Sequence, residues 1–569
     1  MDDRPGRAAQ RRHGLNAAAG GADLIVVGAG AAGLTAAAVA ARAGLRVVLL
    51  EASALVGGTT AISGGMVWLP ANPKMADVGV PDTLADARRY LAATVPPGGP
   101  DDVREAFLQR GADALRDLEA TTALRLRPVL PYPDYHPDLP GATPGARVLE
   151  PLPFDGRELG GAFTTLRPPL PEFMLFDGMM IARPDIPHLR RVGRSWRSTA
   201  HVARLLLRHA RERLVAPRGT TLVLGNALAG RLYLSALQAG VDVRTGAPVA
   251  RLLRDGDRIS GVELQDGSTL RTARGVVLAS GGLSHDAELR RRFVPEAAGL
   301  LSATVPSGAA LGGARLAMAA GGALGTSPAQ QGFWVPASTF TRRDGTRAVH
   351  PHTVADRGKP GLIAVDGHGR RFVNEAVSYH AFVLAQLRAG AVPAWLVCDS
   401  AFLWRYGLGR IKPYTRRLRP CIDDGSLLRG DTPAALAAAA GIDAQGLAAT
   451  LERYNAHARQ GSDPEWGRGS DAYQRHLGDA DRRPNPCVAP IETPPYYAVQ
   501  VRPADLGMAA GLATDGCARV LDAAGAPIPG LWACGNDMQS VMNGAYPGPG
   551  ITLGPALVFG WIAAKDAAG

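Results

Sequence analysis

The stretch Asp23-Leu-Ile-Val-Val-Gly28-Ala-Gly30-Ala-Ala-Gly33 decides the fold of this chain. The apolar run before Gly28 predicts a short buried strand, and the Ala-rich run that follows predicts a helix over 34–42. A second apolar run then ends at Glu51. The glycines therefore lie between a strand and a helix of a βαβ unit, which is the setting in which this spacing is specific.

Each glycine of the stretch has a separate physical task in such a unit. Gly28 allows a tight turn, Gly30 lets the backbone approach a pyrophosphate, and Gly33 lets the helix pack closely on the strand. The phosphates would lie at the helix N-terminus, where free N–H groups and the helix dipole favour negative charge. Glu51 would accept the ribose hydroxyls. The sequence thus predicts a dinucleotide-binding domain.

A second glycine-rich loop, Gly57-Gly58-Thr59-Thr60-Ala-Ile-Ser63-Gly64-Gly65, follows the ribose-binding acid. Its main chain can run along the remainder of an extended FAD. The loop resembles the fumarate reductase/succinate dehydrogenase flavoprotein superfamily and is similar to its 3-ketosteroid dehydrogenase branch. Members that attach FAD covalently use a His in this neighbourhood, and here none occurs between His13 and His136. FAD is therefore expected to bind non-covalently.

The length of 569 residues requires more than one domain. We predict an α/β fold, in which a Rossmann-like FAD-binding domain carries an inserted α+β substrate domain. The expected order is a disordered tail at 1–22, the first part of the FAD-binding domain at 23–300 with a helical excursion at about 100–220, the substrate domain at 301–489, and the C-terminal part of the FAD-binding domain at 490–569.

The FAD-binding domain is expected to contact the cofactor through six segments. These are the two glycine loops, the start of a strand at Val249, the turn after the strand that ends at Ala279, and two C-terminal glycine segments. The expected cofactor-binding residues are Gly28, Gly30, Ala31, Ala32, Gly33, Glu51, Ala52, Ser53, Gly58, Thr59, Thr60, Ser63, Gly64, Gly65, Val249, Ala279, Gly281, Gly535, Asn536, Gly550 and Leu553.

The resemblance also bears on the substrate. In the fumarate reductase branch His and Arg residues clamp a dicarboxylate, but the matching stretches here, 503–515 and 536–546, lack His and Arg respectively. The chain looks instead like a 3-ketosteroid Δ1-dehydrogenase from about residue 23 to 566. In that family a Tyr and the N–H of a Gly four residues later bind the ketone oxygen, a second Tyr is the base, and a third hydrogen-bonds the base. The matching positions are Tyr546, Gly550, Tyr379 and Tyr135.

Several neighbours of these positions admit other interpretations. Tyr132 is a rival to Tyr135, and His136 and Glu375 are interpreted as structural. The family often has a Tyr directly after Asn-Glu, where this chain has Ala376, so the ring substituent of the substrate is left open. Phe333 and Trp334 suit either an apolar pocket or core packing.

The predicted function is FAD-dependent dehydrogenation of a cyclic, steroid-like 3-ketone to the α,β-unsaturated ketone. A Tyr base would remove the α-proton, and a hydride would pass to flavin N5. The alternatives are a Δ4-dehydrogenase or enone reductase of the same superfamily that acts on another apolar ketone, and a flavin-binding protein without catalysis. The electron acceptor is not identified.

Composition limits the partners. The net charge of +11 comes almost entirely from arginine spread along the chain, which does not indicate nucleic-acid binding. Five scattered cysteines indicate a reducing compartment without disulfides and with no metal site. Without an apolar run of about 20 residues, the expectation is a cytoplasmic protein with no transmembrane segment. Phe- and Met-rich residues at 163–181, followed by a basic amphipathic helix over 189–214, suit either packing on the FAD-binding domain or a lid or peripheral membrane contact.

Overall fold

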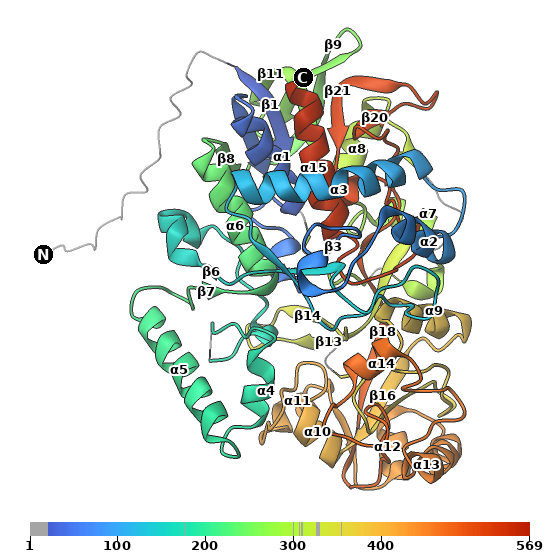
Figure 1. The fold of residues 1–569 in the computed structure, drawn as a ribbon. Helices are drawn as coiled ribbons and strands as arrows, with labels where there is room; N and C mark the ends of the chain where they lie inside the picture. Colours follow the sequence, from blue (N-terminus) through green and yellow to red (C-terminus); the bar gives the residue numbers. More distant parts are fainter. Residues whose placement is uncertain are drawn as a thin grey trace, which may run out of the picture.

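A computed structural model describes residues 21–176, 178–299, 301–306, 308, 311–325, 331–353 and 356–569. Two β-sheets form two layers of the molecule, the first in the upper half of Figure 1 and the second in the lower half. Nearly all of the predicted tail at 1–22 lies outside the described residues, and the first strand already begins at Ala22.

The first sheet is built around the strand that precedes the glycine loop. Its order is β20 (Arg519–Leu521), β21 (Pro527–Ala533), β11 (Thr269–Leu278), β1 (Ala22–Val27), β2 (Val47–Glu51) and β8 (Asp242–Thr245). From β21 to β8 the neighbours are parallel. An antiparallel pair, β9 (Val249–Asp255) and β10 (Arg258–Leu264), extends β11. Parallel strands with a helical crossover confirm the predicted Rossmann-like α/β unit.

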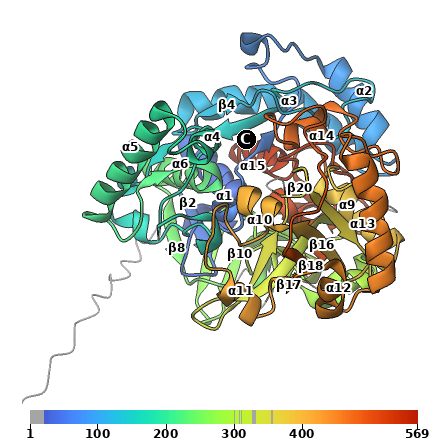
Figure 2. The same ribbon diagram turned by 90° about the horizontal axis from the view of Figure 1, so that it is seen from below.

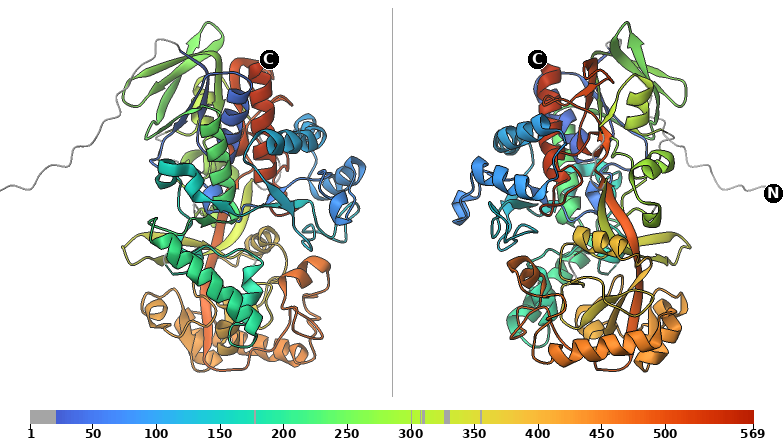
Figure 3. Two further views of the ribbon diagram at one scale, coloured as in Figure 1. Left: turned by 60° about the vertical axis from the view of Figure 1, so that its left-hand side comes forward. Right: turned by 90° about the vertical axis from the view of Figure 1, so that its right-hand side faces the viewer.

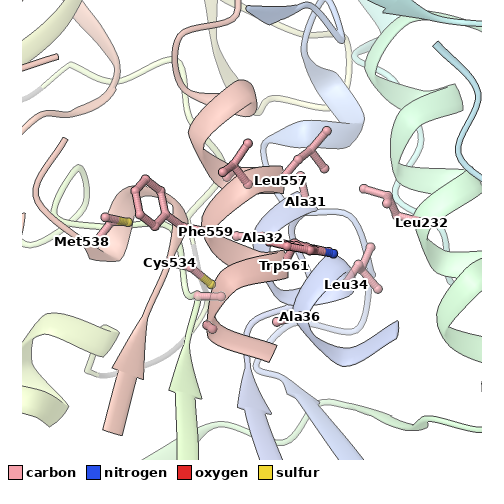
Figure 4. Packing of buried hydrophobic residues seen from close by; sticks show 14 of the residues in the cluster. Ala31, Ala32, Leu34, Ala36, Leu232, Cys534, Met538, Leu557, Phe559 and Trp561 are labelled. Atoms are coloured by element: carbon pink, nitrogen blue, oxygen red, sulfur yellow. The ribbon is translucent and has the colours of Figure 1, made fainter. Parts of the chain in front are cut away.

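Helix α1 (Ala31–Arg42), which follows the first strand of this sheet, lies between two other helices and packs on both, with small side chains on α1. These two helices are α6 (Leu224–Gln238) and α15 (Leu553–Ala568). Figure 4 shows Ala31 and Ala32 of α1 against Leu557 of α15, with Leu232 of α6 on the other side. A Cβ on Gly560 would lie 2.6 Å from the carbonyl oxygen of Ala32, so glycine is required for α1 and α15 to approach this closely.

The excursion from the first sheet contains short strands and four helices. Its elements are β3 (Val67–Trp68), α2 (Leu84–Thr94), α3 (Asp101–Thr121), β4 (Leu126–Pro128), β5 (Val148–Pro151), β6 (Phe154–Asp155), α4 (Asp185–Arg190), α5 (Trp196–Arg213) and β7 (Thr221–Leu222). The basic helix predicted over 189–214 is in fact two helices. It breaks because Gly193 adopts a φ of +77° and the Ser195 side chain then caps α5 by accepting from the Ser198 N–H.

The second sheet forms the core of the other layer. Its order is β14 (Arg347–Pro351), β13 (Gly332–Thr341), β18 (Tyr496–Met508), β16 (Ala394–Asp399) and β15 (Leu362–Val365), with β17 (Leu428–Gly430) also on β18. The helices around it are α9 (Tyr379–Arg388), α10 (Ser400–Tyr406), α11 (Arg419–Asp423), α12 (Pro433–Ala440), α13 (Ala444–Ala458) and α14 (Ala472–Leu477), which Figure 2 shows from below.

The strand pairing differs from the predicted domain limits in one respect. β18 lies beyond the expected boundary at residue 490, yet it is a central strand of the second sheet. The chain returns to the first sheet only at β20. Figure 3 shows β18 as a long strand that rises from the lower layer toward the upper one.

Short elements complete the described chain. They are α7 (Ala287–Phe293), α8 (Gly313–Ala319), the pair β12 (Leu324–Gly325) and β19 (Gly511–Leu512), and the 3₁₀ turns η1 (Thr60–Ile62), η2 (Ala76–Val78), η3 (Gly156–Thr164), η4 (Pro171–Phe173), η5 (Glu296–Ala298) and η6 (Gly535–Asp537).

Candidate active site

The glycine loop between β1 and α1 has the geometry that the sequence predicts. Gly28 adopts a φ of +105°, and a Cβ there would lie 2.3 Å from the Ala279 carbonyl oxygen. A Cβ on Gly33 would lie 1.9 Å from the Gly28 carbonyl oxygen. Gly30 is the N-cap of α1 and has no side chain that could cap the helix. The Thr60 hydroxyl accepts from the Ala31 N–H, and the remaining N–H groups of the first turn, which includes Ala32, are the donors that such a helix offers to a phosphate.

Glu51 ends β2 beside this loop and is 8% exposed. One carboxylate oxygen accepts from the Ala29 N–H and the other accepts from the Ser53 N–H, both at 2.9 Å. A carboxylate has about four acceptor positions, so two of them stay available for hydroxyl donors. Glu51 thus both holds the first glycine loop against the end of β2 and can bind a ribose.

The second glycine loop lies directly against the first. A Cβ on Gly58 would lie 3.6 Å from the Gly30 Cα, and the Ala31 N–H donates to the Thr60 hydroxyl at 3.1 Å. Further along, the Gly65 N–H donates to the Ser63 hydroxyl at 3.0 Å, while Gly64 borders open space. The two loops together form a continuous backbone surface. Thr59 instead accepts from the Val305 N–H at 3.0 Å, so its hydroxyl joins a later segment to the loop.

The ends of β11 and β21 form the opposite wall of the candidate site. Gly281 has a φ of +105° and borders open space, and a Cβ on Gly535 would lie 2.9 Å from the Ala32 Cβ. Ends of parallel strands meet at one edge of a sheet, which is where such folds bind their ligands. Ala279 and Asn536 lie at this edge next to those glycines, whereas Val249 begins β9.

Sequence reasoning missed the residue that joins these two strand ends. Asp537 is fully buried and accepts from the Ser280 hydroxyl at 3.0 Å, from the Gly282 N–H at 2.8 Å and from the Ser280 N–H. Burial raises the pKa of Asp537. An acid directly after Gly535-Asn536 was the available signal.

These walls fit an extended FAD. The glycine positions leave a cradle that a Cβ would fill, the first turn of α1 offers N–H donors, and a buried carboxylate lies where a ribose would follow the pyrophosphate.

Next to this cradle, four tyrosines from distant parts of the chain meet in one buried cluster. The ring of Tyr546 lies 5.1 Å from that of Tyr379 and 5.7 Å from that of Tyr135, centroid to centroid. Tyr135 and Tyr379 are 5.6 Å apart. Tyr473, which sequence reasoning did not single out, lies 4.7 Å from Tyr135. We call this set the tyrosine cluster.

Tyr546 belongs to the loop that leads into α15. Gly550, four residues later, has a φ of +98°, and a Cβ there would lie 2.4 Å from the Met66 carbonyl oxygen. The Gly550 carbonyl accepts from the N–H groups of Trp68 and Gly554. Among the residues that the structure describes, the Gly550 N–H has no acceptor, so it is available as a donor on the same loop as the Tyr546 hydroxyl.

Tyr379 is the first residue of α9. The Ser378 hydroxyl caps this helix by accepting from the Ala381 N–H at 3.2 Å. The positive end of the helix dipole therefore lies at Tyr379, which favours an ionised phenol over a neutral one.

The fully buried Arg357 supports the segment before α9. Its guanidinium donates to the main-chain carbonyls of Glu375 at 3.0 Å and Val377 at 3.2 Å, and also to those of His352 and Thr353. Arg357 was not predicted, and a single Arg in the sequence carries no signal for such a role.

Tyr135 is held to the Tyr546 loop by its main chain, because its N–H donates to the Pro547 carbonyl at 3.0 Å. Its own hydroxyl is buried and has no hydrogen-bond partner within the described chain. The rival Tyr132 lies at the rim of the cluster: it influences the pKa of Tyr135, its ring packs on His476 at 4.6 Å, and the Arg183 guanidinium lies over it at 4.7 Å.

The other rings that pack against Tyr546 are apolar or neutral. Phe333 meets the Tyr546 ring edge-on at 5.5 Å, while Trp334 belongs to the core of the second layer. His380 lies 5.6 Å from Tyr546, and its Nδ1 accepts from the Trp334 N–H. Burial lowers the pKa of His380 to about 3, so this imidazole is neutral. Glu375 is fully buried, and its carboxylate is held in ion pairs with Arg371 and Arg468, which agrees with a structural role.

Burial also dominates the pKa values of the tyrosine hydroxyls in the cluster. It raises the pKa of Tyr546 to about 12, against a lowering by its hydrogen bond with Tyr379. It raises the pKa of Tyr135, Tyr379 and Tyr473 well above the usual value near 10. At neutral pH the phenols of the cluster are hydrogen-bond donors, and any one that acts as a base has to be poised by its neighbours.

In the described chain no group of three or more His, Cys, Asp and Glu side chains could hold a metal ion, and the five cysteines are free. No helix in the described ranges combines the length and the apolar character needed to cross a membrane.

Comparisons with known proteins agree with this geometry. A family model described as an FAD binding domain matches residues 23–553. The chain is 38% identical to 4-oxocyclohex-2-ene-1-carboxylate 5-dehydrogenase of Sinomonas cyclohexanicum, over 96% of this chain and 93% of that protein. It is 35% identical to 3-oxosteroid 1-dehydrogenase of Mycobacterium tuberculosis, over 95% and 97%. The crystal structure of 3-ketosteroid Δ1-dehydrogenase from Sterolibacterium denitrificans, in complex with 1,4-androstadiene-3,17-dione, has a TM-score of 0.88 at 36% identity and covers 96% of this chain and 99% of that one.

Proposed function

The chain belongs to the FAD-binding-domain family and is an FAD-dependent oxidoreductase of the kind that dehydrogenates CH–CH bonds of cyclic ketones, and we propose that its substrate is a 3-ketosteroid-like ketone desaturated next to the carbonyl. The product is the α,β-unsaturated ketone. The observation that carries the proposal is the convergence of Tyr546, Tyr379 and Tyr135 beside Gly550, at the edge of the FAD cradle.

The first layer holds FAD in this proposal. The first turn of α1 binds the pyrophosphate, Glu51 binds the ribose, and the loop at 57–65 follows the cofactor toward the tyrosine cluster. FAD supplies the acceptor for the hydride that leaves the β-carbon.

The ketone oxygen accepts two hydrogen bonds, from the Tyr546 hydroxyl and from the Gly550 N–H. Both donors are on one loop, and the main chain of that loop is fixed because the Gly550 carbonyl is bonded to Trp68 and Gly554. Rigid donors aimed at an oxygen that gains negative charge stabilise the enolate that forms. The α C–H bond of the substrate becomes acidic as a result.

Tyr379 receives the α-proton at its hydroxyl oxygen. The positive end of α9 favours the phenolate, and the neighbouring Tyr135 hydroxyl, which has no other partner in the described chain, lowers the pKa of Tyr379 against the raising effect of burial. As the α C–H bond breaks, its electron pair forms the new C=C bond. The hydrogen on the β-carbon then leaves with the electron pair of its own C–H bond, as hydride. The proton and the hydride account for the two hydrogens removed.

The decisive experiment is anaerobic titration of the FAD-loaded protein with saturated and Δ4 3-ketosteroids, while the flavin absorbance at about 450 nm is followed. We expect a stoichiometric loss of this absorbance, and NMR of the product should place the new double bond at carbons 1 and 2. A double bond at carbons 4 and 5 would favour the Δ4-dehydrogenase alternative. Reoxidation of reduced flavin by an enone would favour the reductase. Absence of any change with every ketone would favour a flavin-binding protein without catalysis.

A second candidate substrate is a single-ring ketone that carries a carboxylate. Two observations favour it: the 38% identity to a dehydrogenase named for 4-oxocyclohex-2-ene-1-carboxylate, and a cation at the rim of the tyrosine cluster. Arg183 lies over Tyr132, is partly exposed and forms no ion pair with the described acids. If the substrate is of this kind, Arg183→Gln should raise KM for the carboxylate and leave KM for an uncharged ketone unchanged.

A further inference from the structure

A separate surface, which plays no part in the proposed reaction, is formed by residues 173–176 and 178–215. We call it the α4–α5 arm. Figures 1 and 3 show α5 at the outside of the molecule, apart from both sheets. Nine of the large apolar side chains that the described chain exposes come from this arm: Phe173, Phe176, Ile186, Val192, Trp196, Leu206, Leu207, Leu214 and Val215. A run of this kind on one arm marks a contact surface.

Helix α5 has two apolar stripes, and only one faces the protein. The inward stripe consists of the buried residues Ser198, Val202, Leu205 and His209. About half a turn away around the helix, a second stripe at i, i+4, i+7 and i+11 consists of Trp196, Ala200, Ala203 and Leu207. Trp196 is 77% exposed and Leu207 is 62% exposed, and Leu214 continues the stripe at 85%. Nothing in the described chain covers this second stripe.

The charge of the arm is strongly positive. Residues 183–213 contain nine arginines and two acids. Both acids have partners: Asp185 contacts His201 at 2.8 Å, and Glu212 contacts Arg208 at 3.6 Å. Among the described residues no acid pairs with Arg194, Arg197, Arg204, Arg211 or Arg213. Arg197, Arg204, Arg208 and Arg211 flank the outward stripe on one side, as the spacing along α5 requires.

A neighbouring segment continues this surface. The Tyr414 hydroxyl donates to the Arg190 carbonyl, so residues around 414 lie against the end of α4. Tyr414 packs on Trp404, and both rings are more than a third exposed. Directly afterwards Arg416, Arg417 and Arg419 line a shallow cleft. Both segments thus place exposed aromatic rings close to arginines.

We propose that the α4–α5 arm docks this enzyme on the surface of an anionic lipid bilayer. Helix α5 would lie in the plane of the interface, with Trp196 and Leu207 in the headgroup region and the arginines against lipid phosphates. An exposed apolar stripe flanked by arginine is the arrangement that binds such surfaces. Charge argues against a second copy of the chain as the occupant, because two arms of the same strong positive charge would repel one another.

The test measures sedimentation of the FAD-loaded full chain with vesicles. One set contains phosphatidylcholine alone and the other contains about 30% phosphatidylglycerol. We expect binding to the anionic set only, and a marked loss of binding when the salt concentration shortens the Debye length to about 3 Å.

Two pairs of variants separate the contribution of the apolar stripe to vesicle binding from that of the flanking arginines. Trp196→Ser with Leu207→Ser removes the apolar stripe, and Arg197→Gln with Arg204→Gln removes two flanking charges. Each pair should lower the partition coefficient roughly 10- to 100-fold. The matched control is Arg291→Gln with Arg292→Gln, two exposed arginines on α7, which should bind as the unmodified protein does. Flavin absorbance and the thermal midpoint check that every variant is folded.

Three outcomes would overturn the proposal. They are no sedimentation with anionic vesicles, equal binding by all variants, and an equal loss of binding in the α7 control. A dimer in analytical ultracentrifugation that Trp196→Ser with Leu207→Ser dissociates, without vesicle binding, would instead assign the stripe to self-association. None of these readouts depends on the substrate.

Discussion

The ring of Tyr379 meets the ring of Tyr546 edge-on, with their centroids 5.1 Å apart. The contact joins the first residue of α9, in the second layer, to the loop that leads into α15, in the first layer. In a ketone the α-carbon is bonded to the carbonyl carbon, so a base for the α-proton and a donor to the carbonyl oxygen have to be neighbours. This pair of phenols meets that requirement.

Tyr546→Phe should therefore lower kcat by roughly 10²- to 10³-fold, the cost of losing one donor to a developing oxyanion. The ring contacts remain, so the free energy of unfolding should change by about 1 kcal/mol or less. Steady-state kinetics with a 3-ketosteroid and an artificial electron acceptor measure the effect. The matched control is Tyr454→Phe, another buried Tyr, whose hydroxyl has no partner in the described chain and which lies in a different core. Equal rates for Tyr546→Phe and the unmodified enzyme would contradict the donor role.

The pH dependence of kcat should reveal the base. Because burial raises the pKa of Tyr379 well above 10, only a small fraction is ionised at neutral pH, and that fraction rises up to about tenfold per pH unit. The rate should therefore increase with pH over the neutral and alkaline range. Tyr379→Phe should be nearly inactive and lack this increase. A residual rate in this variant that keeps the same alkaline limb would assign the base to another group.

The fold was predictable because its signals are local. The stretch from Asp23 to Glu51 contains a strand, a glycine turn, a helix and a strand in register, and each part appears where it was expected. The place of β18 was not predictable. Its sequence is compatible with a strand in either sheet, because pairing with β13 and β16 is a long-range choice and no local pattern distinguishes the two sheets.

The candidate site was predictable where family resemblance supplied positions. Tyr135, Tyr379, Tyr546 and Gly550 came from motifs, and the structure brings the three rings together. Tyr473 was missed because it acts through tertiary contacts, and one of twelve tyrosines has no local feature that sets it apart. Asp537 did have a local signal, its place directly after Gly535-Asn536, but its hydrogen bonds to Ser280 and Gly282 are long-range contacts that the sequence does not show.

Glu51→Gln should weaken FAD binding by roughly 10- to 100-fold, because a charged acceptor of buried hydrogen bonds is lost and the Gln amide cannot accept at both ends. Flavin fluorescence during titration of the apoprotein measures Kd. Glu150→Gln is the control, since Glu150 is equally buried but pairs with Arg127 on β4. Similar losses of affinity in both variants would indicate a general loss of stability instead of a lost ribose contact.

All of the flavin should be released when the protein is denatured by acid. The loop at 57–65 contains no His, and covalent members of the superfamily use a His in this neighbourhood. Absorbance of the supernatant and of the washed precipitate measures the two fractions. Yellow colour that stays in the precipitate would show a covalent bond formed by another residue, which peptide mapping would locate.

Arg357 should prove to be a positioning residue for Tyr379. Its guanidinium donates to four main-chain carbonyls, two of which, Glu375 and Val377, belong to the segment that leads into α9. A lysine has one nitrogen and cannot reproduce this planar set of donors. Arg357→Lys should therefore lower kcat by about tenfold or more and the free energy of unfolding by about 1–3 kcal/mol, since buried carbonyls lose donors.

The control for Arg357 is Arg231→Lys. Arg231 also donates to main-chain carbonyls, those of Ala123, Leu152 and Pro153, far from the tyrosine cluster. It should lose stability but keep kcat, and its pH profile should match that of the unmodified enzyme. In Arg357→Lys, by contrast, the alkaline limb of the profile should shift, because the phenol of Tyr379 is no longer held at the N-terminus of α9 in the same position. If both variants lose stability and neither changes kcat or the pH profile, Arg357 serves folding alone.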